Sequence, residues 1–203
     1  MTIDEGYIKY VSDWTQGPAP GRDTTDLLES WRQPLFQAGL IGQYEDPGVG
    51  FGNISVRCKG TGMFVISGTQ TGHLARTSAA DYALVTAYDV DNNRVSCRGP
   101  VQASSESLTH AAIYELSAGI NAVVHAHSRT LWDQLRGRLP TTGKDVAYGT
   151  PEMAREFVRL YRSTDFATGG IAVMAGHEDG IISIGRSLEE ATRRVLRIND
   201  ELR

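Results

Sequence analysis

The sequence predicts an α/β protein in which a central, mainly antiparallel sheet of mixed order is covered by helices on both faces, as a three-layer sandwich. Two observations carry this prediction. Short apolar segments come in adjacent pairs joined by turn residues, as in 82–97 and in 171–184. Segments with helical spacing of apolar residues separate these pairs. A chain of 203 residues is long enough to bury a sizeable core.

The helices are expected where capping residues precede apolar residues at helical spacing. The first should run from about Asp26 to Ala38, with Thr24 or Thr25 as its cap and Gly39 at its end. Three more are expected at about 104–116, at 150–161 behind Thr150-Pro151, and from the capping box Ser187-Leu188-Glu189-Glu190 to Arg203.

The strands are short apolar segments bounded by glycine and polar turn residues. An alternating strand is expected at 53–57, and others at 63–67, 82–89, 94–97, 122–127, 171–174 and 181–184. Residues 1–24, with the breaker cluster Gly17-Pro18-Ala19-Pro20-Gly21, are expected to form an N-terminal arm. Residues 25–203 should then form one catalytic domain.

The composition is that of an ordinary soluble protein, with 40% hydrophobic and 22% charged residues. A net charge of −4 with dispersed basic residues argues against a nucleic-acid partner. No apolar run approaches the roughly 20 residues that a membrane-spanning helix needs, and the first residues do not resemble a secretory signal. A cytoplasmic protein without membrane association is the expectation.

The most informative motif is His125-Ala126-His127 after an apolar run. Side chains on a strand alternate between its faces, so these two imidazoles should point the same way and could bind one metal ion. Zinc commonly takes three protein ligands in catalytic sites. The third candidate is His177, in the turn of the expected hairpin at 171–184. On the pattern alone, metal binding and purely structural histidines are equally good interpretations.

Two glycine-rich turns adjoin short strands, at Gly48–Asn53 and at Gly68-Thr69-Gln70-Thr71-Gly72. Such turns expose backbone N–H groups, and two of them next to short strands suggest an anion cradle.

Taken in order, these motifs resemble the class II aldolase/adducin family, and within it the zinc-dependent sugar-phosphate aldolases. The resemblance rests on five segments and extends from about Asp26 to the last helix. The segments are Gly52–Arg57, Ile66–Gly72, Ser104-Ser105-Glu106, His125-Ala126-His127 and Gly176-His177.

The resemblance implies a ligand set and a reaction. His125, His127 and His177 would hold one Zn²⁺ per subunit, although three imidazoles also accept Mn²⁺, Co²⁺ or Fe²⁺. Glu106 would lie beside the metal as a ligand or as the catalytic acid and base. A metal-bound substrate and an adjacent carboxylate are what cleavage of a ketose phosphate requires, because the resulting enediolate must be stabilised and a proton moved.

The resemblance also implies a phosphate site formed by Asn53, by Thr69 or Thr71 with the loop backbone up to Gly72, and by Ser104 and Ser105. Structural interpretations stay open for several residues. Asn53 could form a left-handed turn with Gly52, and Ser104 and Ser105 could cap a helix. Glu106 could be a first-turn residue that interacts with the helix dipole.

Two further residues are weaker candidates. His110 lies one helical turn after Glu106 and could orient it, or could be a buried structural residue. Tyr148 could replace the proton-donating tyrosine of the family, which a longer segment carries where this chain has only 128–148. Surface turn acids are the expectation for Glu178 and Asp179, which follow His177 in place of the family's usual glycine.

The function expected is a metal-dependent aldolase that cleaves a ketose phosphate to dihydroxyacetone phosphate and an aldehyde through a zinc-stabilised enediolate. The alternatives are a dehydratase or decarboxylase on the same scaffold, and a non-catalytic adducin-like interaction module. The resemblance further implies a small phosphorylated sugar as substrate and a homo-oligomer, expected to be a tetramer.

Overall fold

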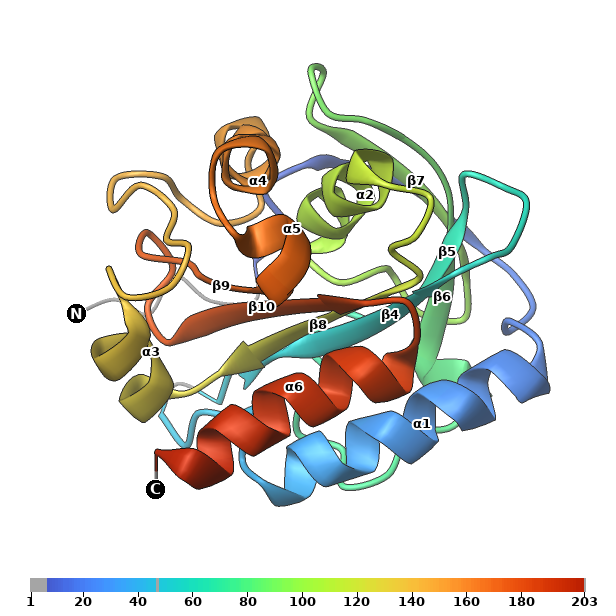
Figure 1. Cartoon of the computed structure of the whole chain (residues 1–203). Helices are drawn as coiled ribbons and strands as arrows, with labels where there is room; N and C mark the ends of the chain where they lie inside the picture. The colour runs from blue at the N-terminus through green and yellow to red at the C-terminus, as the bar shows by residue number, and fades with distance from the viewer. Residues whose placement is uncertain (1–6, 47, 203) are drawn as a thin grey trace.

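A computed structural model describes residues 7–46 and 48–202. Eight strands form one sheet in the order β1-β7-β6-β5-β4-β8-β10-β9 (Figure 1). The strands are β1 (Val11–Gln16), β4 (Asn53–Arg57), β5 (Phe64–Ser67), β6 (Tyr82–Asp89), β7 (Arg94–Gly99), β8 (Ala122–His127), β9 (Ile171–Val173) and β10 (Gly180–Gly185). Strands β2 (Gly42–Gln43) and β3 (Gly50–Phe51) form a separate two-stranded sheet.

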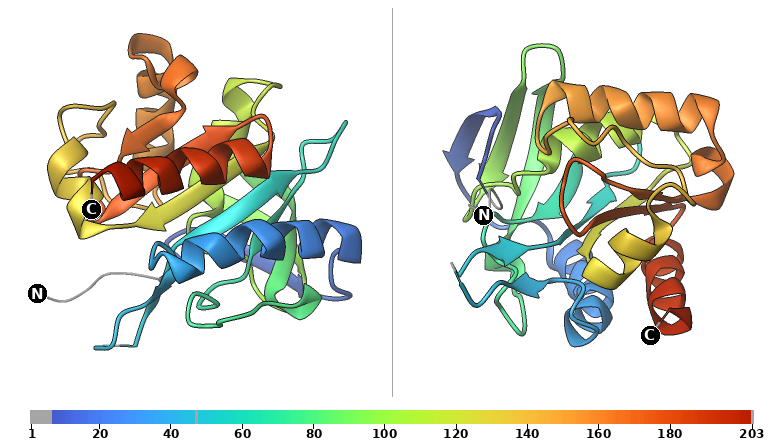
Figure 2. Two further views of the ribbon diagram at one scale, coloured as in Figure 1. Left: turned by 60° about the horizontal axis from the view of Figure 1, so that its bottom comes forward. Right: turned by 90° about the vertical axis from the view of Figure 1, so that its left-hand side faces the viewer.

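Helices cover both faces of the large sheet. They are α1 (Arg22–Gln37), α2 (Ser107–Leu116), α3 (Arg129–Leu135), α4 (Pro151–Ser163), α5 (Phe166–Gly169) and α6 (Leu188–Glu201), with a short 3-10 helix at Ala79–Asp81. Helices α1 and α6 lie on one face, and α2 and α4 on the other (Figures 1 and 2). Strand β1 is parallel to β7 and the other pairs of the large sheet are antiparallel. The predicted α/β sandwich with a mainly antiparallel mixed sheet is confirmed.

Each face of the sheet has its own apolar core. Val124 and Ala126 of β8 pack with Leu28 of α1 and Val195 of α6, whereas Val123 packs with residues of α2 and α4. All six residues of β8 are buried. Since side chains alternate along a strand, His125 and His127 lie on the face of Val123, toward α2.

Several element boundaries differ from those expected. Helix α1 begins at Arg22 after Gly21, so Thr24 and Thr25 lie inside the helix and do not cap it. The Thr25 hydroxyl donates to the carbonyl of Arg22 at 3.1 Å, which lets threonine continue the helix. Residues 11–16 of the expected arm form edge strand β1. The expected helix end at Arg203 lies outside the described residues.

Helix α2 begins at Ser107, three residues after the expected start, and Glu106 precedes it without a side-chain capping bond, so Ser104 and Ser105 do not cap this helix. At the end of α1 and at the starts of α4 and α6, the boundaries follow residues that the sequence singles out. Gly39 adopts a left-handed conformation after α1, Thr150 caps α4 and Ser187 caps α6. Helix α3, absent from the sequence predictions, begins after Ser128, whose hydroxyl accepts from the Leu131 N–H. Within residues 7–46 and 48–202, no helix has the length and apolar character that crossing a membrane requires.

A buried arginine joins α1 to the glycine-rich loop after β5. Arg32 is fully buried on the helix face that carries Leu28 and Leu35. Its Nη2 lies within hydrogen-bond distance of the carbonyls of Thr71, Gly72 and Leu74, at 3.2, 3.1 and 2.7 Å. Arg32 therefore fixes the loop that the sequence singles out for phosphate binding.

We expect Arg32→Met to lower the free energy of unfolding by about 2–4 kcal/mol, because buried carbonyls would lose charge-assisted hydrogen bonds. Urea denaturation measures the change. Arg197→Met, at an exposed arginine of α6, is the control and should change stability by less than about 0.5 kcal/mol. An Arg32→Met protein as stable as the wild type would contradict the bracing role.

Candidate metal centre and active site

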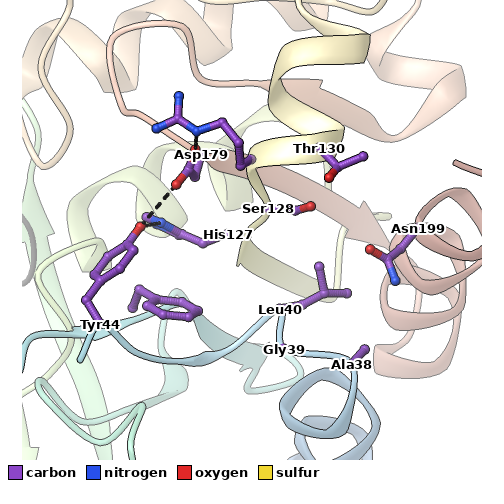
Figure 3. Close-up of a pocket in the computed structure, with 11 residues that line it drawn as sticks. Ala38, Gly39, Leu40, Tyr44, His127, Ser128, Thr130, Asp179 and Asn199 are labelled. Carbon is purple, nitrogen blue, oxygen red and sulfur yellow. Dashed lines mark hydrogen bonds and ion pairs between the residues drawn. The ribbon is translucent and has the colours of Figure 1, made fainter. Parts of the chain in front are cut away.

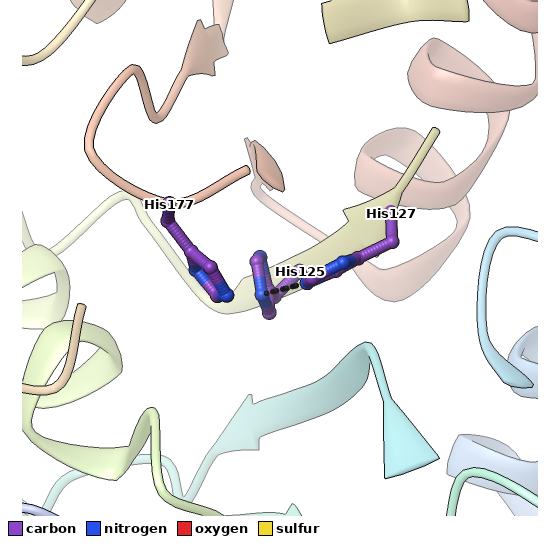
Figure 4. Close-up of side chains that lie close together, drawn as sticks. All are labelled: His125, His127 and His177. Carbon is purple, nitrogen blue, oxygen red and sulfur yellow. Dashed lines mark hydrogen bonds between the residues drawn. The ribbon is translucent and has the colours of Figure 1, made fainter. Parts of the chain in front are cut away.

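Three histidines converge at the end of β8. His125 and His127 come from β8, and His177 comes from the turn between β9 and β10. In the antiparallel register, His127 pairs with Gly180, so the turn lies directly beside the strand end. Figure 4 shows the three rings turned toward one another.

Glycines allow this close approach of the turn. A Cβ at Gly176 would lie 2.0 Å from the carbonyl oxygen of Val146, and one at Gly180 would lie 3.2 Å from the His177 ring. The segment before Tyr148 and the β9–β10 turn can therefore pack against each other only with glycine at position 176.

The geometry of the triad fits a metal ion. Each histidine offers a ligand atom within 4.8 Å of the others, and all three side chains are buried. The Nε2 atoms of His125 and His127 are 3.0 Å apart. Two nitrogens bound to one tetrahedral zinc at about 2.0–2.1 Å lie about 3.3 Å apart, so only a small adjustment is needed.

The environment of His127 favours the neutral, metal-binding form of its imidazole. Burial holds the pKa of His127 well below its ordinary value, and the neighbouring His177 lowers it further. The Nδ1 of His125 lies 3.3 Å from the carbonyl oxygen of Ile181. A proton on Nδ1 that is donated to this carbonyl leaves Nε2 as the ligand atom.

Glu106 lies beside the triad. It is 1% exposed, and its Oε1 is 3.8 Å from Nδ1 of His177. It is the residue immediately before α2, and its side chain makes no capping hydrogen bond to the helix. The carboxylate is thus oriented toward the histidines, which is the position that a proton-transferring group or a fourth ligand requires; its role stays a prediction.

The residues predicted to bind phosphate come from three neighbouring segments. Asn53 of β4 pairs with His125 in the sheet and lies on the same face. The Thr69 N–H donates to Gln102, and the Ser104 N–H to Ser67, so the loop after β5 and the loop before α2 are joined. Ser105 is buried in that second loop, next to Glu106.

Parts of this region already have structural partners. The Thr71 hydroxyl donates to the carbonyl of Gly68 at 2.8 Å, within its own turn. The Ser104 hydroxyl accepts from the Glu106 N–H at 3.3 Å. A Cβ at Gly72 would lie 2.2 Å from the carbonyl oxygen of Gly42, so this glycine lets the loop pack against β2. These contacts leave the Thr69 hydroxyl as a better candidate than that of Thr71.

His110 belongs to a buried polar network behind the site. Its Nδ1 is 2.7 Å from the Ser55 hydroxyl, which is also 2.7 Å from the Tyr114 hydroxyl. Burial lowers the pKa of His110 to about 3. The contacts favour a structural role for this side chain over orientation of Glu106.

Tyr148 contacts the site through its ring. The ring stacks on His177 with a centroid distance of 4.4 Å, and the Lys9 ammonium lies 3.8 Å from the ring centroid. Its hydroxyl accepts from the Tyr7 N–H at 3.3 Å. These contacts suit a residue that positions His177 and attaches the N-terminal segment.

Sequence reasoning missed the side chains that lie behind His127. The Tyr44 hydroxyl is 2.9 Å from His127 Nδ1 and 3.4 Å from Asp179 Oδ2 (Figure 3). Arg129 Nε lies 2.9 Å from Asp179 Oδ1. Burial raises the pKa of Asp179, and Arg129 opposes this change. Asp179 is thus not a surface turn acid, whereas Glu178 is an exposed one that pairs with Arg129.

A cavity of about 320 Å³ lies on the outer side of His127, and Tyr44, Arg129 and Asp179 are among the residues that line it. The end of α1, Phe51, the start of α3 and Asn199 of α6 complete its walls (Figure 3). Tyr44 stands in an irregular turn between two-residue strands, and its sequence surroundings give no signal of this contact.

Comparison with known proteins assigns the family. Residues 46–202 match the family model described as the class II aldolase and adducin N-terminal domain. The chain belongs to this family. The resemblance inferred from the sequence motifs is therefore confirmed, and the matched residues include the triad and Glu106.

Solved structures of the family have the same fold. One, L-fuculose 1-phosphate aldolase, is 19% identical with a TM-score of 0.67, over 90% of this chain and 86% of that one. L-fuculose-1-phosphate aldolase from Thermus thermophilus is 24% identical with a TM-score of 0.60, over 88% of each chain. YgbL from Escherichia coli, a candidate aldolase/epimerase/decarboxylase, is 19% identical with a TM-score of 0.64, over 88% and 86%. At these identities the likeness establishes the fold.

The buried state of His110 makes stability depend on pH. Its pKa of about 3 in the folded protein lies below the ordinary 6.5, so the unfolded chain binds more protons between these values. The contribution of His110 to stability is therefore fully present above about pH 6.5 and is lost toward pH 3, at most about 1.4 kcal/mol per pH unit.

We expect His110→Gln to reduce this pH slope in urea denaturation between pH 6 and 4, whatever its effect on absolute stability. His73→Gln, at an exposed loop histidine, should leave the slope unchanged. NMR titration of the wild type should show no protonation of His110 above about pH 5. A His110 resonance that titrates near pH 6.5 would contradict the buried, neutral state.

Proposed function

We propose that this protein is a metal-dependent aldolase that cleaves a ketose phosphate into dihydroxyacetone phosphate and an aldehyde. The observation that carries the proposal is the buried cluster of His125, His127 and His177 with the Glu106 carboxylate 3.8 Å from His177. Family membership supports it, as does the fold shared with sugar-phosphate aldolases.

The three histidines would hold the metal through neutral imidazole nitrogens. We propose zinc, because three imidazole nitrogens are a donor set that zinc commonly takes in catalytic sites; Mn²⁺, Co²⁺ and Fe²⁺ accept the same donors. When bound, the metal supplies a Lewis acid that polarises a substrate carbonyl.

Glu106 would move the proton. In the cleavage direction, a base takes the proton of the hydroxyl next to the breaking carbon–carbon bond, and the electron pair of that bond passes to the ketone-derived fragment. That fragment then takes a proton at carbon. The Glu106 Oε1 beside His177 is the group we assign to this transfer.

The substrate phosphate would be held where the loops after β5 and before α2 join. We assign it to the side chains of Asn53, Thr69, Ser104 and Ser105, with Thr71 and Gly72 contributing through the loop backbone. Hydroxyl and backbone N–H groups near a helix start are suited to an anion. Arg32, which braces the carbonyls of this loop, would maintain the cradle.

The alternatives differ in what the site must do. A dehydratase or decarboxylase of the same family would use the same triad on another substrate. An adducin-like interaction module would not require three buried histidines beside a buried carboxylate, and this cluster argues for catalysis. A homotetramer and a cytoplasmic location stay predictions.

Metal analysis with a retro-aldol assay on a panel of ketose 1-phosphates tests the proposal. We expect about one metal ion per subunit and release of dihydroxyacetone phosphate. Glu106→Gln should lower kcat at least about 100-fold, because the proton-transferring group is lost. Glu115→Gln, at the exposed end of the same helix, is the matched control and should retain full activity.

His125→Ala and His127→Ala should abolish both metal binding and activity. A wild-type protein that holds metal but releases no dihydroxyacetone phosphate from any ketose 1-phosphate would exclude the aldolase and favour the dehydratase or decarboxylase. A properly folded wild-type protein that binds no divalent metal would revive the interaction module.

A further inference from the structure

His127 contacts side chains on its outer as well as its inner edge. Its Nε2 lies 3.0 Å from Nε2 of His125, on the side of the triad (Figure 4). Its Nδ1 lies 2.9 Å from the hydroxyl of Tyr44, on the side of the cavity (Figure 3). The Phe51 ring stacks on the imidazole with a centroid distance of 5.3 Å and an interplanar angle of 29°. The ring is thus held at both edges and across one face.

Because Nε2 of His127 faces the triad, the direction of the hydrogen bonds from His127 Nδ1 to Tyr44 and from Tyr44 to Asp179 is fixed. A neutral imidazole that binds a metal through Nε2 carries its proton on Nδ1, so Nδ1 must donate. The Tyr44 oxygen accepts this proton, and its own O–H is then available to Asp179 Oδ2 at 3.4 Å. Asp179 in turn pairs with Arg129 at 2.9 Å.

We propose that Tyr44 is a positioning residue for the metal centre. Through its hydroxyl it would fix the orientation and tautomer of His127 and connect this ligand to the Asp179–Arg129 ion pair. The inference rests on the metal site of the proposed function, and it does not depend on which substrate the enzyme takes.

The Nδ1 atoms of the two β8 histidines have different kinds of partner. The Nδ1 of His125 meets a main-chain carbonyl, that of Ile181 at 3.3 Å, which a side-chain substitution cannot remove. The partner of His127 is the side chain of Tyr44, which directly follows strand β2, and the Asp179 carboxylate lies behind the Tyr44 hydroxyl. A carboxylate behind the hydroxyl makes it a better acceptor and so makes the imidazole a stronger metal ligand.

Cobalt binding by Tyr44→Phe tests the proposal. The variant keeps the ring that packs at 4.7 Å on Phe51 and loses only the hydroxyl. We expect the Co²⁺ affinity of the metal-free protein to fall about 10–100-fold, and the visible d–d spectrum of the loaded protein to change, because the ligand field of His127 changes. Tyr161→Phe, at a partly buried tyrosine of α4, is the matched control and should match the wild type in both measurements.

The substitution Asp179→Asn keeps the shape of the side chain behind the Tyr44 hydroxyl and removes its negative charge. We expect a smaller loss of Co²⁺ affinity than with Tyr44→Phe. The double variant should bind about as tightly as Tyr44→Phe alone, because Asp179 acts through the Tyr44 hydroxyl. Thermal unfolding of the metal-free proteins separates loss of affinity from loss of fold.

The outcomes distinguish the two proposals. If Tyr44→Phe binds Co²⁺ with wild-type affinity and spectrum, the positioning role is wrong and the metal centre stands. If the affinity losses of Tyr44→Phe and Asp179→Asn are additive, the connection between them is wrong. If the folded wild-type protein binds neither Co²⁺ nor Zn²⁺, the metal centre itself is wrong.

Discussion

The site depends on one constraint, the alternation of side chains along a strand that is buried on both faces. In β8, Val124 and Ala126 fill the core beneath α1 and α6, so His125 and His127 must enter the opposite layer beneath α2. Buried imidazoles are costly unless they stay neutral and their nitrogens have partners. Ile181, Tyr44 and the triad itself satisfy this requirement.

The sheet topology brings the rest of the site to this strand. β8 lies between β4 and β10, so Asn53 approaches from one side and the turn with His177 from the other. The loop before α2 joins the end of β5 through Ser104 and Ser67, which delivers Glu106 to the same place. Close approach at Gly72, Gly176 and Gly180 lets these loops meet without clashes of Cβ atoms. The site is thus built by short connections at one end of a rigid sheet.

Local patterns made the fold and the core of the site predictable. Hairpins around 91–93 and 174–180, caps at Thr150 and Ser187, and two histidines at strand spacing are all signals within a few residues. The start of α1 was predicted wrongly because threonine can cap a helix or continue it, and Thr24 and Thr25 here lie inside the helix that begins at Arg22. Arg32 and Tyr44 could not be found in this way. Their partners are 39 and 83 residues away, and only the folded chain brings them together.

The net charge that the proposed metal site would have bears on the substrate that we propose. Three imidazole ligands, which bind a metal in their neutral form, would leave the full charge of a divalent ion uncompensated, and the Glu106 carboxylate would offset one unit of it. The Asp179 carboxylate lies behind Tyr44 and is already paired with Arg129, so it adds little further compensation. A loaded site of this kind retains positive charge in a buried setting, where electrostatic interactions are strong. Such a site would therefore favour a substrate that brings its own negative charge and develops more as the carbon–carbon bond breaks, as the proposed ketose phosphate does and a neutral sugar does only in part.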